Sequence, residues 1–524
     1  MLWIVAMLVT AAPLWLVRDL PMVDLPQHLY LLDVLHRLRD ATTLYPATFE
    51  FRFRFTPYLG YYAAVGGLNA LLPLEVANKL FVSAAVVGLP LATAFLLRSL
   101  GRPTWPALLA VSVAYGDNFG WGFVNTSAAI PLALVSLGAF VRAIADPVRR
   151  ARWTVVFGTS LLAGFLMHPV PTLFLVPALP LALGLTRAGD DDRGGSALDW
   201  WRRRLVPLAG VTPFLLAALL WMAGFVSTSP ELRPGGAHAS WGRILTSGSI
   251  GWQSPGTNLR ALLWLGANLF DDGSDSLALL LALILGLAAL VARFFESAPV
   301  ATTAPLERMR PWAFGVVALG LFTVLPRDVP GVVQYLNPRL APLVLALAAT
   351  LVPRGGARST RWLTLAAAAT PLVLAIPLAI GLRSFDAEAS ALRRVAAGAA
   401  ERPRIMGLVF EPHSHFVHHP VYLHGAALIA RLKGGLPNYS LAGWQQVSLR
   451  YRGAPPPALP SEWRPDLFDY GTMGGAYDHF LVRGAPPDSL FGARLGTELR
   501  VAAHDGDWWL LRRAAADSGG PRAP

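Results

Sequence analysis

The chain has 524 residues, of which 54% are hydrophobic and 15% are charged, and its formal net charge is +12. A soluble domain carries about 25% charged residues, so this composition excludes an ordinary soluble protein; with a mean hydropathy of +0.47 it indicates a polytopic, mainly α-helical membrane protein. Cysteine is absent from the sequence, which excludes disulfides, thiol nucleophiles and thiolate metal sites.

Apolar runs recur from residue 2 to residue 382. A spanning helix needs about 20 mostly apolar residues, and we predict eleven such helices. The predicted spans are residues 2–17, 76–97, 103–117, 126–144, 153–167, 170–186, 205–226, 276–293, 311–326, 332–353 and 362–382. No small-residue cleavage site follows the first run, so we expect it to be an uncleaved anchor.

Another uncharged run, residues 55–74, is long enough to be a twelfth span. The distribution of arginines between the loops argues against a crossing at this run. If it does not cross, arginines gather in alternate loops, and the opposite loops hold only Arg327. We therefore predict a juxtamembrane or re-entrant hairpin at 55–74, on the outer side of the membrane, with the N-terminus cytoplasmic and the C-terminus outside. Arginine in short loops orients a membrane protein, so the positive charge does not imply a nucleic-acid partner. The arginines of the predicted inner loops are Arg98, Arg102, Arg142, Arg149, Arg150, Arg152, Arg187, Arg193, Arg202, Arg203, Arg204, Arg293, Arg308, Arg310, Arg354, Arg358 and Arg361.

The first outer loop, residues 18–75, contains a predicted helix of its own. From Gln27 to Arg39 the apolar residues form a stripe, with charged residues mostly opposite, which is typical of a helix lying in the membrane interface. Pro26 would occupy the first turn, an acceptable position for proline. The stripe consists of Leu29, Leu32, Val34, Leu35 and Leu38.

The composition changes after residue 382, where the chain becomes polar and rich in proline and glycine. Arg404 to Phe410 is predicted to be a strand, Val421 to Leu432 a helix, and Leu499 to Leu511 a hairpin. A small α/β domain outside the membrane is the simplest fold for these elements. The predicted parts are a membrane domain over 1–382, the α/β domain over 383–514 and a disordered tail over 515–524.

Asp24 lies in the first outer loop, followed by Pro26 and His28 at the beginning of the predicted interfacial helix. An aspartate is ionised near neutral pH and can take a proton from an acceptor hydroxyl or orient it. An ordinary loop carboxylate would fit the same spacing. We favour a catalytic role because a second acidic loop is predicted on the same side.

That second loop is Y-G-D-N-F-G-W-G-F-V-N, residues 115–125. Its Asp117 is the only charged residue between Arg102 and Arg142. A carboxylate at the membrane edge among aromatic residues is often functional, although a solvated turn aspartate is the simpler alternative. Together with His28 of the first loop, this loop supplies candidate substrate-binding residues, which are Trp121 and Asn125.

Two cations and a histidine are further candidates for substrate binding. The run 340–353 is too short to span alone, so its helix is predicted to begin near Val332, which would bury Arg339 towards the outer leaflet. Arginine binds phosphate bidentately, and an intramembrane cation needs a partner. Lys79, at the outer start of its own helix, could instead snorkel to headgroups. His168, in the turn M-H-P-V-P, would face the same outer cavity or serve only the turn.

The predicted outer domain holds a group of closely spaced histidines, and such spacing could serve zinc. No carboxylate or cysteine pattern completes a ligand set, so we predict no metal site there. The histidines are His413, His415, His418, His419 and His424.

With one acidic loop after the first span and another after the third, the chain resembles the GT-C superfamily of membrane glycosyltransferases. The matching residues are V-D-L-P-Q-H (23–28), the Y-Y…L-P-L-E-V-A-N-K approach to the second span (61–79) and Y-G-D-N-F-G (115–120). Among its members, the chain resembles the bacterial aminoarabinose and RgtA-like transferases and, more distantly, the protein mannosyltransferases. The resemblance covers roughly residues 1–200, and a C-terminal domain outside the membrane agrees with it.

The resemblance implies a polyprenyl-phosphate sugar donor, inverting transfer to a glycan, lipid or protein acceptor, and a first-loop aspartate as general base. On this chain the base would be Asp24, with Asp117 as the second acidic residue, and Lys79 and Arg339 would be candidates for the lipid phosphate. Many members show an Asp-Glu pair in the first loop, whereas Leu25 follows Asp24 here. The need for a divalent cation and the acceptor type therefore stay open. No glycine-rich nucleotide-binding loop is visible, which agrees with a donor delivered by lipid.

Three other functions stay open. A secondary transporter should show internal repeats and polar sites at mid-membrane, whereas the polar residues here concentrate at the predicted outer edge. An O-antigen polymerase or ligase would carry its large outer loop between late spans. A non-enzymatic scaffold would tolerate substitution of the lone acidic residues.

Overall fold

The computed structural model describes residues 1–186, 201, 204–228, 250–295, 305–329, 333–353, 356–442 and 447–514. The predicted tail over 515–524 lies outside these residues, as do several predicted inner-loop arginines such as Arg193 and Arg354. The chain divides into two compact units. The helical unit comprises Met1–Leu16 and Phe55–Ile380, and the mixed unit comprises Val17–Arg54 and Gly381–Pro524.

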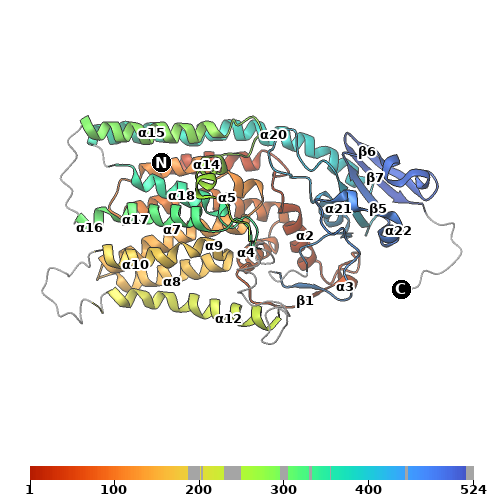
Figure 1. Ribbon diagram of the computed structural model, residues 1–524, viewed down its shortest axis with the longest axis horizontal. Helices are drawn as coiled ribbons and strands as arrows, with labels where there is room; N and C mark the ends of the chain where they lie inside the picture. Colours follow the sequence, from red (N-terminus) through yellow and green to blue (C-terminus); the bar gives the residue numbers. More distant parts are fainter. Residues whose placement is uncertain are drawn as a thin grey trace. The chain divides into compact units, whose positions relative to one another are not determined.

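The helical unit consists of α-helices (Figure 1) and several 3-10 helices. Its longer helices are α5 (Leu74–Ser99), α7 (Val124–Ala145), α8 (Arg150–Met167), α12 (Thr212–Thr228), α15 (Ser276–Phe295), α17 (Arg310–Val324) and α20 (Thr370–Ala397), which ends in the mixed unit. Its shorter helices are α1 (Leu2–Ala11), α4 (Leu59–Asn69), α6 (Asp117–Gly120), α9 (Pro169–Leu173), α10 (Leu175–Leu185), α14 (Pro255–Gly266), α16 (Pro305–Arg308), α18 (Ala341–Ala348) and α19 (Ala357–Ala367). Its 3-10 helices are η1 (Ala12–Trp15), η2 (Trp105–Val113), η4 (Val206–Val211), η6 (Pro338–Leu340) and η7 (Ala349–Leu351).

Within the described residues, five helices are long and apolar enough to cross a membrane. They are Leu74–Ser99, Val124–Ala145, Val206–Gly224, Ser276–Phe295 and Arg358–Ala397. Shorter apolar helices are Leu2–Trp15, Pro169–Leu185 and Pro338–Leu351. The chain is therefore a mainly helical, multi-pass membrane protein, and the number of eleven spans stays a prediction.

Helix α7 packs against α5 and α8 at the centre of the helical unit. Leu137 and Phe140 on α7 are completely buried, and the ring of Phe140 packs on that of Phe157 from α8. A Cβ at Gly138 would meet the Phe95 ring of α5 at 2.9 Å, so glycine permits this close approach. Burial of apolar side chains between these helices therefore builds the core.

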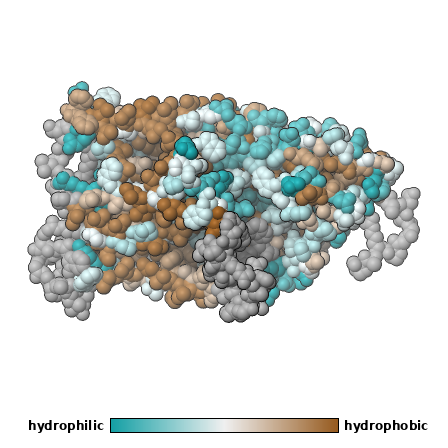
Figure 2. Space-filling view, in the orientation of Figure 1, coloured by the Kyte–Doolittle hydropathy of each residue, from teal (hydrophilic) through white to brown (hydrophobic). Residues whose placement is uncertain are grey.

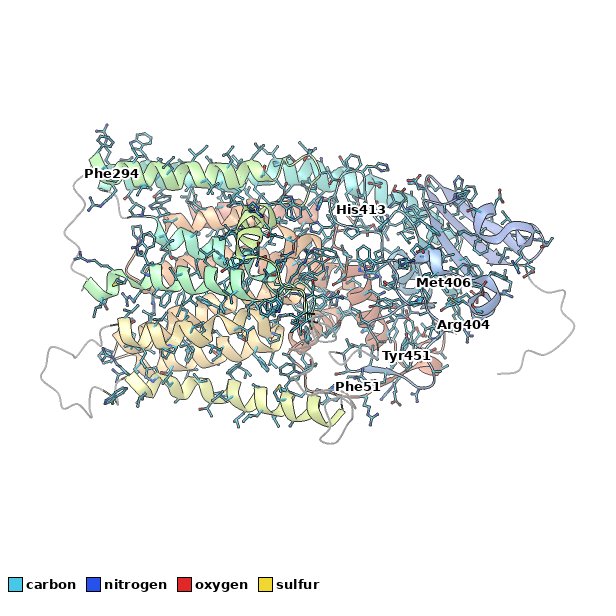
Figure 3. The ribbon with its side chains drawn as sticks, viewed as in Figure 1. Phe51, Phe294, Arg404, Met406, His413 and Tyr451 are labelled. Carbon is cyan, nitrogen blue, oxygen red and sulfur yellow. The ribbon has the colours of Figure 1, made fainter. Side chains whose placement is uncertain are left out.

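Helix α15 carries an exposed apolar surface. Hydrophobic residues gather over it in the space-filling view (Figure 2). Leu280, Leu283 and Leu287 are about half exposed, and Phe294 at the end of the helix is 82% exposed (Figure 3). Such a surface is stable in lipid and not in water.

The structure differs from the sequence-based prediction in two of the expected spans. The stretch 103–117 forms the buried 3-10 helix η2, whose residues are all buried. The helix expected to begin near Val332 instead begins with Pro338 in η6, so Arg339 lies in its first turn. The reason is local, because Tyr335 has a positive φ of 54°, which no helix accommodates, and Pro338 is suited to a first turn.

The run 55–74, predicted to remain on one side of the membrane, contains helix α4, which has 11 residues. A helix of that length is about 16 Å long and too short to span a bilayer. Tyr61 on α4 is completely buried and donates a hydrogen bond to Asn78 Oδ1 on α5 at 2.8 Å. Helix α4 is thus packed on the helical unit.

The mixed unit is built on a five-stranded sheet in the order β3-β2-β5-β7-β6. The strand β2 runs parallel to β3 and β5, whereas β7 runs antiparallel to β5 and β6. Met406 on β2 and Phe480 on β5 are completely buried in the core of this unit, and Figure 3 shows Arg404 and Met406 together on β2. The strands are β2 (Arg404–Val409), β3 (Leu436–Pro437), β5 (His479–Arg483), β6 (Leu499–Asp505) and β7 (Trp508–Arg513).

The remaining elements of the mixed unit include both segments of the chain that form it. They are α2 (Leu25–His36), α3 (Tyr45–Thr48), β1 (Phe49–Phe51), α21 (Gly425–Lys433), β4 (Leu449–Tyr451), η8 (Pro465–Leu467), α22 (Tyr470–Met473), η9 (Gly474–Ala476), α23 (Pro487–Phe491) and η10 (Gly492–Arg494). The predicted strand at 404–410, helix at 421–432 and hairpin at 499–511 correspond to β2, α21 and the β6–β7 pair.

Helix α2 was predicted to lie in the membrane interface with its apolar stripe against lipid. In the structure, α21 packs against α2 instead. Leu32 and Val34 are buried at 2% and 0% exposure. The hydroxyl of Tyr30 donates to the carbonyl of Gly435 at 3.1 Å, just after α21. The predicted interfacial helix is therefore a core element of the mixed unit.

The division of the chain also differs from the predicted domain boundaries. Residues 18–54 were expected to belong to the membrane domain, and they lie in the mixed unit instead. Strand β1 pairs antiparallel with β4, which places Phe51 and Tyr451 on neighbouring strands (Figure 3). This pairing and the burial of α2 join two segments that are nearly 400 residues apart in sequence.

Candidate active site

Asp24 occupies the N-cap position of α2, yet its carboxylate does not cap the helix. An N-cap aspartate normally accepts a hydrogen bond from the second or third backbone N–H of its helix. Here Oδ1 of Asp24 lies 3.5 Å from Nε2 of His424, and the Asp24 side chain is 33% exposed. The carboxylate is therefore held by a side chain from the C-terminal segment and remains accessible to solvent.

His424 lies between two carboxylates. Its Nδ1 is 3.0 Å from Oε2 of Glu462, an ion pair whose geometry is not that of a linear hydrogen bond. The His424 side chain is 7% exposed and that of Glu462 is 13% exposed. Tyr439 stacks on the imidazole with a centroid distance of 5.9 Å and an interplanar angle of 6°. Two nitrogens of one buried ring thus contact two acids.

The electrostatics of this group favour an imidazolium. Burial alone would lower the pKa of His424, but the charge of Glu462 and the contact with Asp24 outweigh it and raise the pKa to about 10. His424 is therefore positively charged at neutral pH, and the three side chains together carry two negative charges and one positive charge.

The first turn of α2 is fixed on the segment that carries Tyr439. Gln27 is buried, and its Nε2 donates to the Tyr439 carbonyl at 3.1 Å. His28, predicted to bind substrate, is half-buried on the same turn, and its backbone N–H donates to the Asp24 carbonyl at 3.1 Å. Asp24 and His28 therefore lie on one turn, as the sequence predicts.

Asp117, the second predicted acidic residue, is in the helical unit and is only 2% exposed. Its Oδ1 accepts a hydrogen bond from Nδ2 of Asn268 at 3.0 Å. A Cβ at Gly116 would overlap the backbone carbonyl oxygens of Leu265 and Gly266. The loop therefore packs directly on the end of α14, and Asp117 is not the solvated turn residue that was the alternative.

Arg339 is half-buried and lies 3.5 Å above the ring centroid of Phe123. Its Nη1 donates to Oγ1 of Thr126 at 3.2 Å, and its backbone carbonyl accepts from Nδ2 of Asn118 at 3.0 Å. Residues 115–126 and the η6 segment are therefore in direct contact. Among the predicted residues, the structure brings Asp117, Trp121, Asn125 and Arg339 into this region.

An aromatic group adjoins Arg339. The ring of Tyr335 packs on that of Trp121 with centroids 4.6 Å apart, and Trp121 stacks on Phe123 at 6.1 Å. Asn125 is 5% exposed in the first turn of α7. Aromatic faces stabilise a cation and offer an apolar contact surface.

His168 and Lys79 have different environments. His168 caps α9, since its Nδ1 accepts the Val170 backbone N–H at 3.2 Å, and the edge of Tyr58 lies against it with centroids 5.1 Å apart. Burial and the nearby charge of Arg339 both lower the pKa of His168, which lies in the turn between α8 and α9, so the ring is neutral. Lys79 is half-buried on α5, one residue after Asn78.

The histidines of the mixed unit do not converge on one point. His415 is 3.3 Å from Glu388 through Nδ1, and His424 instead contacts Asp24 and Glu462. Across the described part of the chain, no group of three or more histidine, cysteine, aspartate or glutamate side chains has an arrangement that could hold a metal ion.

Sequence reasoning missed Glu462 and the contact that His424 makes with Asp24. Glu462 is a single acid near several prolines, which gives no local periodicity, and His424 was interpreted only as one of a histidine group. The available signal was indirect: Glu462 is the only acidic residue between Glu411 and Asp466.

Neither a family model nor a curated protein matches this sequence. Two crystal structures of ArnT from Cupriavidus metallidurans, one bound to undecaprenyl phosphate and one in the apo state, share its fold with a TM-score of 0.55 each. They are 13% and 12% identical in sequence, and each alignment covers 99% of this chain and 98% of that chain. Arabinofuranosyltransferase AftD from Mycobacteria is 15% identical, with a TM-score of 0.47, 98% of this chain covered and 42% of AftD covered. The chain therefore shares the fold of these two ArnT structures over nearly its whole length.

Proposed function

We propose that the protein is a membrane glycosyltransferase that moves a sugar from a polyprenyl-phosphate donor to an acceptor, with inversion at the anomeric carbon. The fold supports this proposal, because ArnT has been crystallised with undecaprenyl phosphate bound. The acceptor would be a glycan, lipid or protein. The mixed unit and the N-cap of α2 would lie outside a bacterial plasma membrane, and the N-terminus would be cytoplasmic.

The observation that carries the proposal is the position of Asp24. Its side chain is one third exposed, makes no helix-cap hydrogen bond, and is held by His424. A carboxylate that is oriented by the protein yet accessible is what a general base requires. A purely structural aspartate at an N-cap would instead accept a backbone N–H.

The proposed reaction is a single displacement. The acceptor hydroxyl loses its proton to Asp24, and its oxygen forms a bond to the anomeric carbon of the sugar. The bond between that carbon and the phosphate oxygen breaks at the same time, and the polyprenyl phosphate leaves with the electron pair. Bond formation opposite the leaving group inverts the anomeric configuration.

Arg339 would stabilise the leaving phosphate. Its Nη1 donates to Thr126, its Nε and Nη2 donate to the Gln334 carbonyl at 3.3 Å, and it lies on the face of Phe123 within the helical unit. Charge-assisted hydrogen bonds from arginine to phosphate are among the strongest in proteins. Stabilising the charge that develops on the leaving group lowers the barrier directly.

Proteoliposomes with a panel of radiolabelled polyprenyl-phosphate sugars test the proposal. We expect transfer from at least one of these donors to lipid or glycan acceptors extracted from a bacterial envelope, and none from the matching nucleotide sugars. Transfer from nucleotide sugars alone would contradict the lipid-phosphate donor. No transfer by folded protein from any donor would contradict the enzyme and favour a transporter or scaffold.

A further inference from the structure

The charged group behind Asp24 has a role in catalysis beyond holding the fold together. We propose that His424 and Glu462 are positioning residues: a protonated His424, held by Glu462, donates a hydrogen bond to Oδ1 of Asp24 and leaves Oδ2 to take the acceptor's proton. This inference rests on the proposed function, because it requires Asp24 to be the base.

Asp24 needs such a partner because its own helix does not orient it. The carboxylate makes no cap hydrogen bond, and one third of its side chain is exposed, so rotation about the Cα–Cβ bond would displace it from the acceptor. A misplacement of about 1 Å can cost a factor of about 100 in rate. The contact with Nε2 of His424 at 3.5 Å restricts this rotation, and such contacts often tighten only when substrate binds.

His424 is itself fixed by packing. It immediately precedes α21, the helix that packs on α2. A Cβ at the next residue, Gly425, would meet the Trp508 ring at 3.1 Å, so the chain at this point lies tightly against the sheet. The stacked ring of Tyr439 covers one face of the imidazole. The packing of α2 on α21 thus brings His424 and Asp24 into contact.

Glu462 supplies the charge that keeps His424 protonated. A buried imidazolium with one carboxylate partner would be costly, and a second buried carboxylate at 3.0 Å offsets that cost. The groups that face His424 are Asp24 from α2, Glu462 from the loop before η8, and the hydroxyl-bearing ring of Tyr439. Burial, together with the charges of Glu462 and Asp24, raises the pKa of Tyr439, so its hydroxyl stays neutral.

This arrangement predicts how transfer depends on pH. Because the pKa of His424 is raised to about 10, the imidazolium persists through neutral pH and is lost only as the pH rises through that value. A neutral imidazole keeps one N–H, and the nearer Glu462, at 3.0 Å from Nδ1 against 3.5 Å between Nε2 and Asp24, favours that proton on Nδ1. The donor to Asp24 is then lost, so transfer should decline there. Without the charge of Glu462, the pKa of His424 should fall towards the ordinary histidine value of about 6.5.

The test is the pH profile of kcat in proteoliposomes for the wild type, Glu462→Gln and His424→Gln. The wild type should keep its activity up to about pH 10. In Glu462→Gln the midpoint of the decline should lie at least about two pH units lower, so that kcat at pH 8.5 is at least about fourfold below the wild type, with the donor KM unchanged. His424→Gln should be slow and independent of pH in this range, since its amide cannot titrate.

His479→Gln is the matched control. His479 is also buried in the mixed unit, is 2% exposed and pairs with Asp478, but it is on β5. Loss of a buried structural histidine should lower the yield or the kcat without moving the alkaline decline. An unchanged midpoint in Glu462→Gln, with the wild type active and Asp24→Asn inactive, would overturn the positioning role and leave the proposed function intact.

A measurement independent of activity keeps the two proposals distinguishable. In protein labelled with ¹⁵N-histidine, the resonances that disappear in His424→Gln should show an imidazolium at pH 8.5 in the wild type and a neutral ring in Glu462→Gln. A neutral His424 in the wild type would overturn the inference. An imidazolium in a protein that transfers no sugar would overturn the proposed function, while confirming that Glu462 keeps His424 protonated.

Discussion

The guanidinium of Arg339 lies on the face of the Phe123 ring, 3.5 Å from its centroid. Arg339 begins the helix at η6, whereas Phe123 immediately precedes α7, and Thr126 of α7 accepts a hydrogen bond from the same guanidinium. Two segments separated by more than 200 residues thus place one cation at the beginning of two helices. The guanidinium thus contacts an aromatic face, a hydroxyl and the carbonyl of Gln334, which accepts from Nε and Nη2 at 3.3 Å.

Arg339→Gln should raise the KM for the lipid-phosphate donor. Loss of charge-assisted hydrogen bonds to phosphate costs about 1.5–3 kcal/mol, which corresponds to roughly a tenfold to hundredfold weaker interaction. The matched control is Arg142→Gln, since Arg142 also lies over aromatic rings, those of Phe95 and Trp153, but at the opposite end of α7. An equal effect of both substitutions on KM would contradict a phosphate-binding role for Arg339.

Gly116→Ala should displace the loop that carries Asp117. The added Cβ would overlap two backbone carbonyl oxygens at the end of α14, and backbone cannot move aside as a flexible side chain can. Such overpacking costs about 1–3 kcal/mol, and the melting temperature in detergent measures it. Gly286→Ala on α15, where a Cβ meets nothing within 4 Å, should leave the melting temperature unchanged or raise it slightly. Equal melting temperatures for both variants would contradict the tight packing at Gly116.

Glu388→Gln should destabilise the mixed unit. Glu388 contacts Arg483 at 3.2 Å, and the Arg483 side chain is only 3% exposed beneath the rings of Tyr422 and Trp508. Removing one member of a buried ion pair costs about 3–5 kcal/mol. Asp507, which lies 3.8 Å from Arg483 and is 58% exposed, should offset only a small part of that cost.

Thermal unfolding of Glu388→Gln, Arg483→Gln and the double variant measures this pair. The double variant should lose less stability than the sum of the two single variants, because the charge that each leaves behind is then absent. Asp466→Asn, which removes the exposed pair between Asp466 and Arg464, should have no measurable effect. Additive losses in the double variant would show that Glu388 and Arg483 do not act as a pair.

The sequence predicts the elements whose signals are local. Long apolar runs give helices such as α5 and α7, and alternating apolar residues with a tight turn give the β6–β7 hairpin around Gly506. The acidic loops could also be identified, because a lone charge such as Asp117 stands out against more than thirty apolar and neutral neighbours. Proline and its neighbours explain why the helix at Arg339 begins later than its apolar pattern predicts.

Partners that are distant in sequence could not be predicted. The apolar stripe on α2 indicates that one face of the helix is shielded from water, but it does not show whether lipid or protein shields it. The structure shows that α21 packs on this face. Likewise, the carboxylate of Asp24 gives no sign of His424, which follows 400 residues later, and Glu462 has no periodic neighbours. A single sequence specifies which side chains carry charge and not which of them meet.

The most direct test of the account is sugar transfer by Asp24→Asn beside Asp40→Asn, in the same proteoliposomes and with the donor that the wild type uses. The asparagine keeps the size of the side chain but cannot take a proton, so kcat should fall by about 100-fold to 10,000-fold with little change in donor KM. Asp40, an aspartate of the same segment that contacts Arg37 and Thr42, should tolerate the identical change. Equal transfer by Asp24→Asn and the wild type would exclude Asp24 as the base and contradict the central claim.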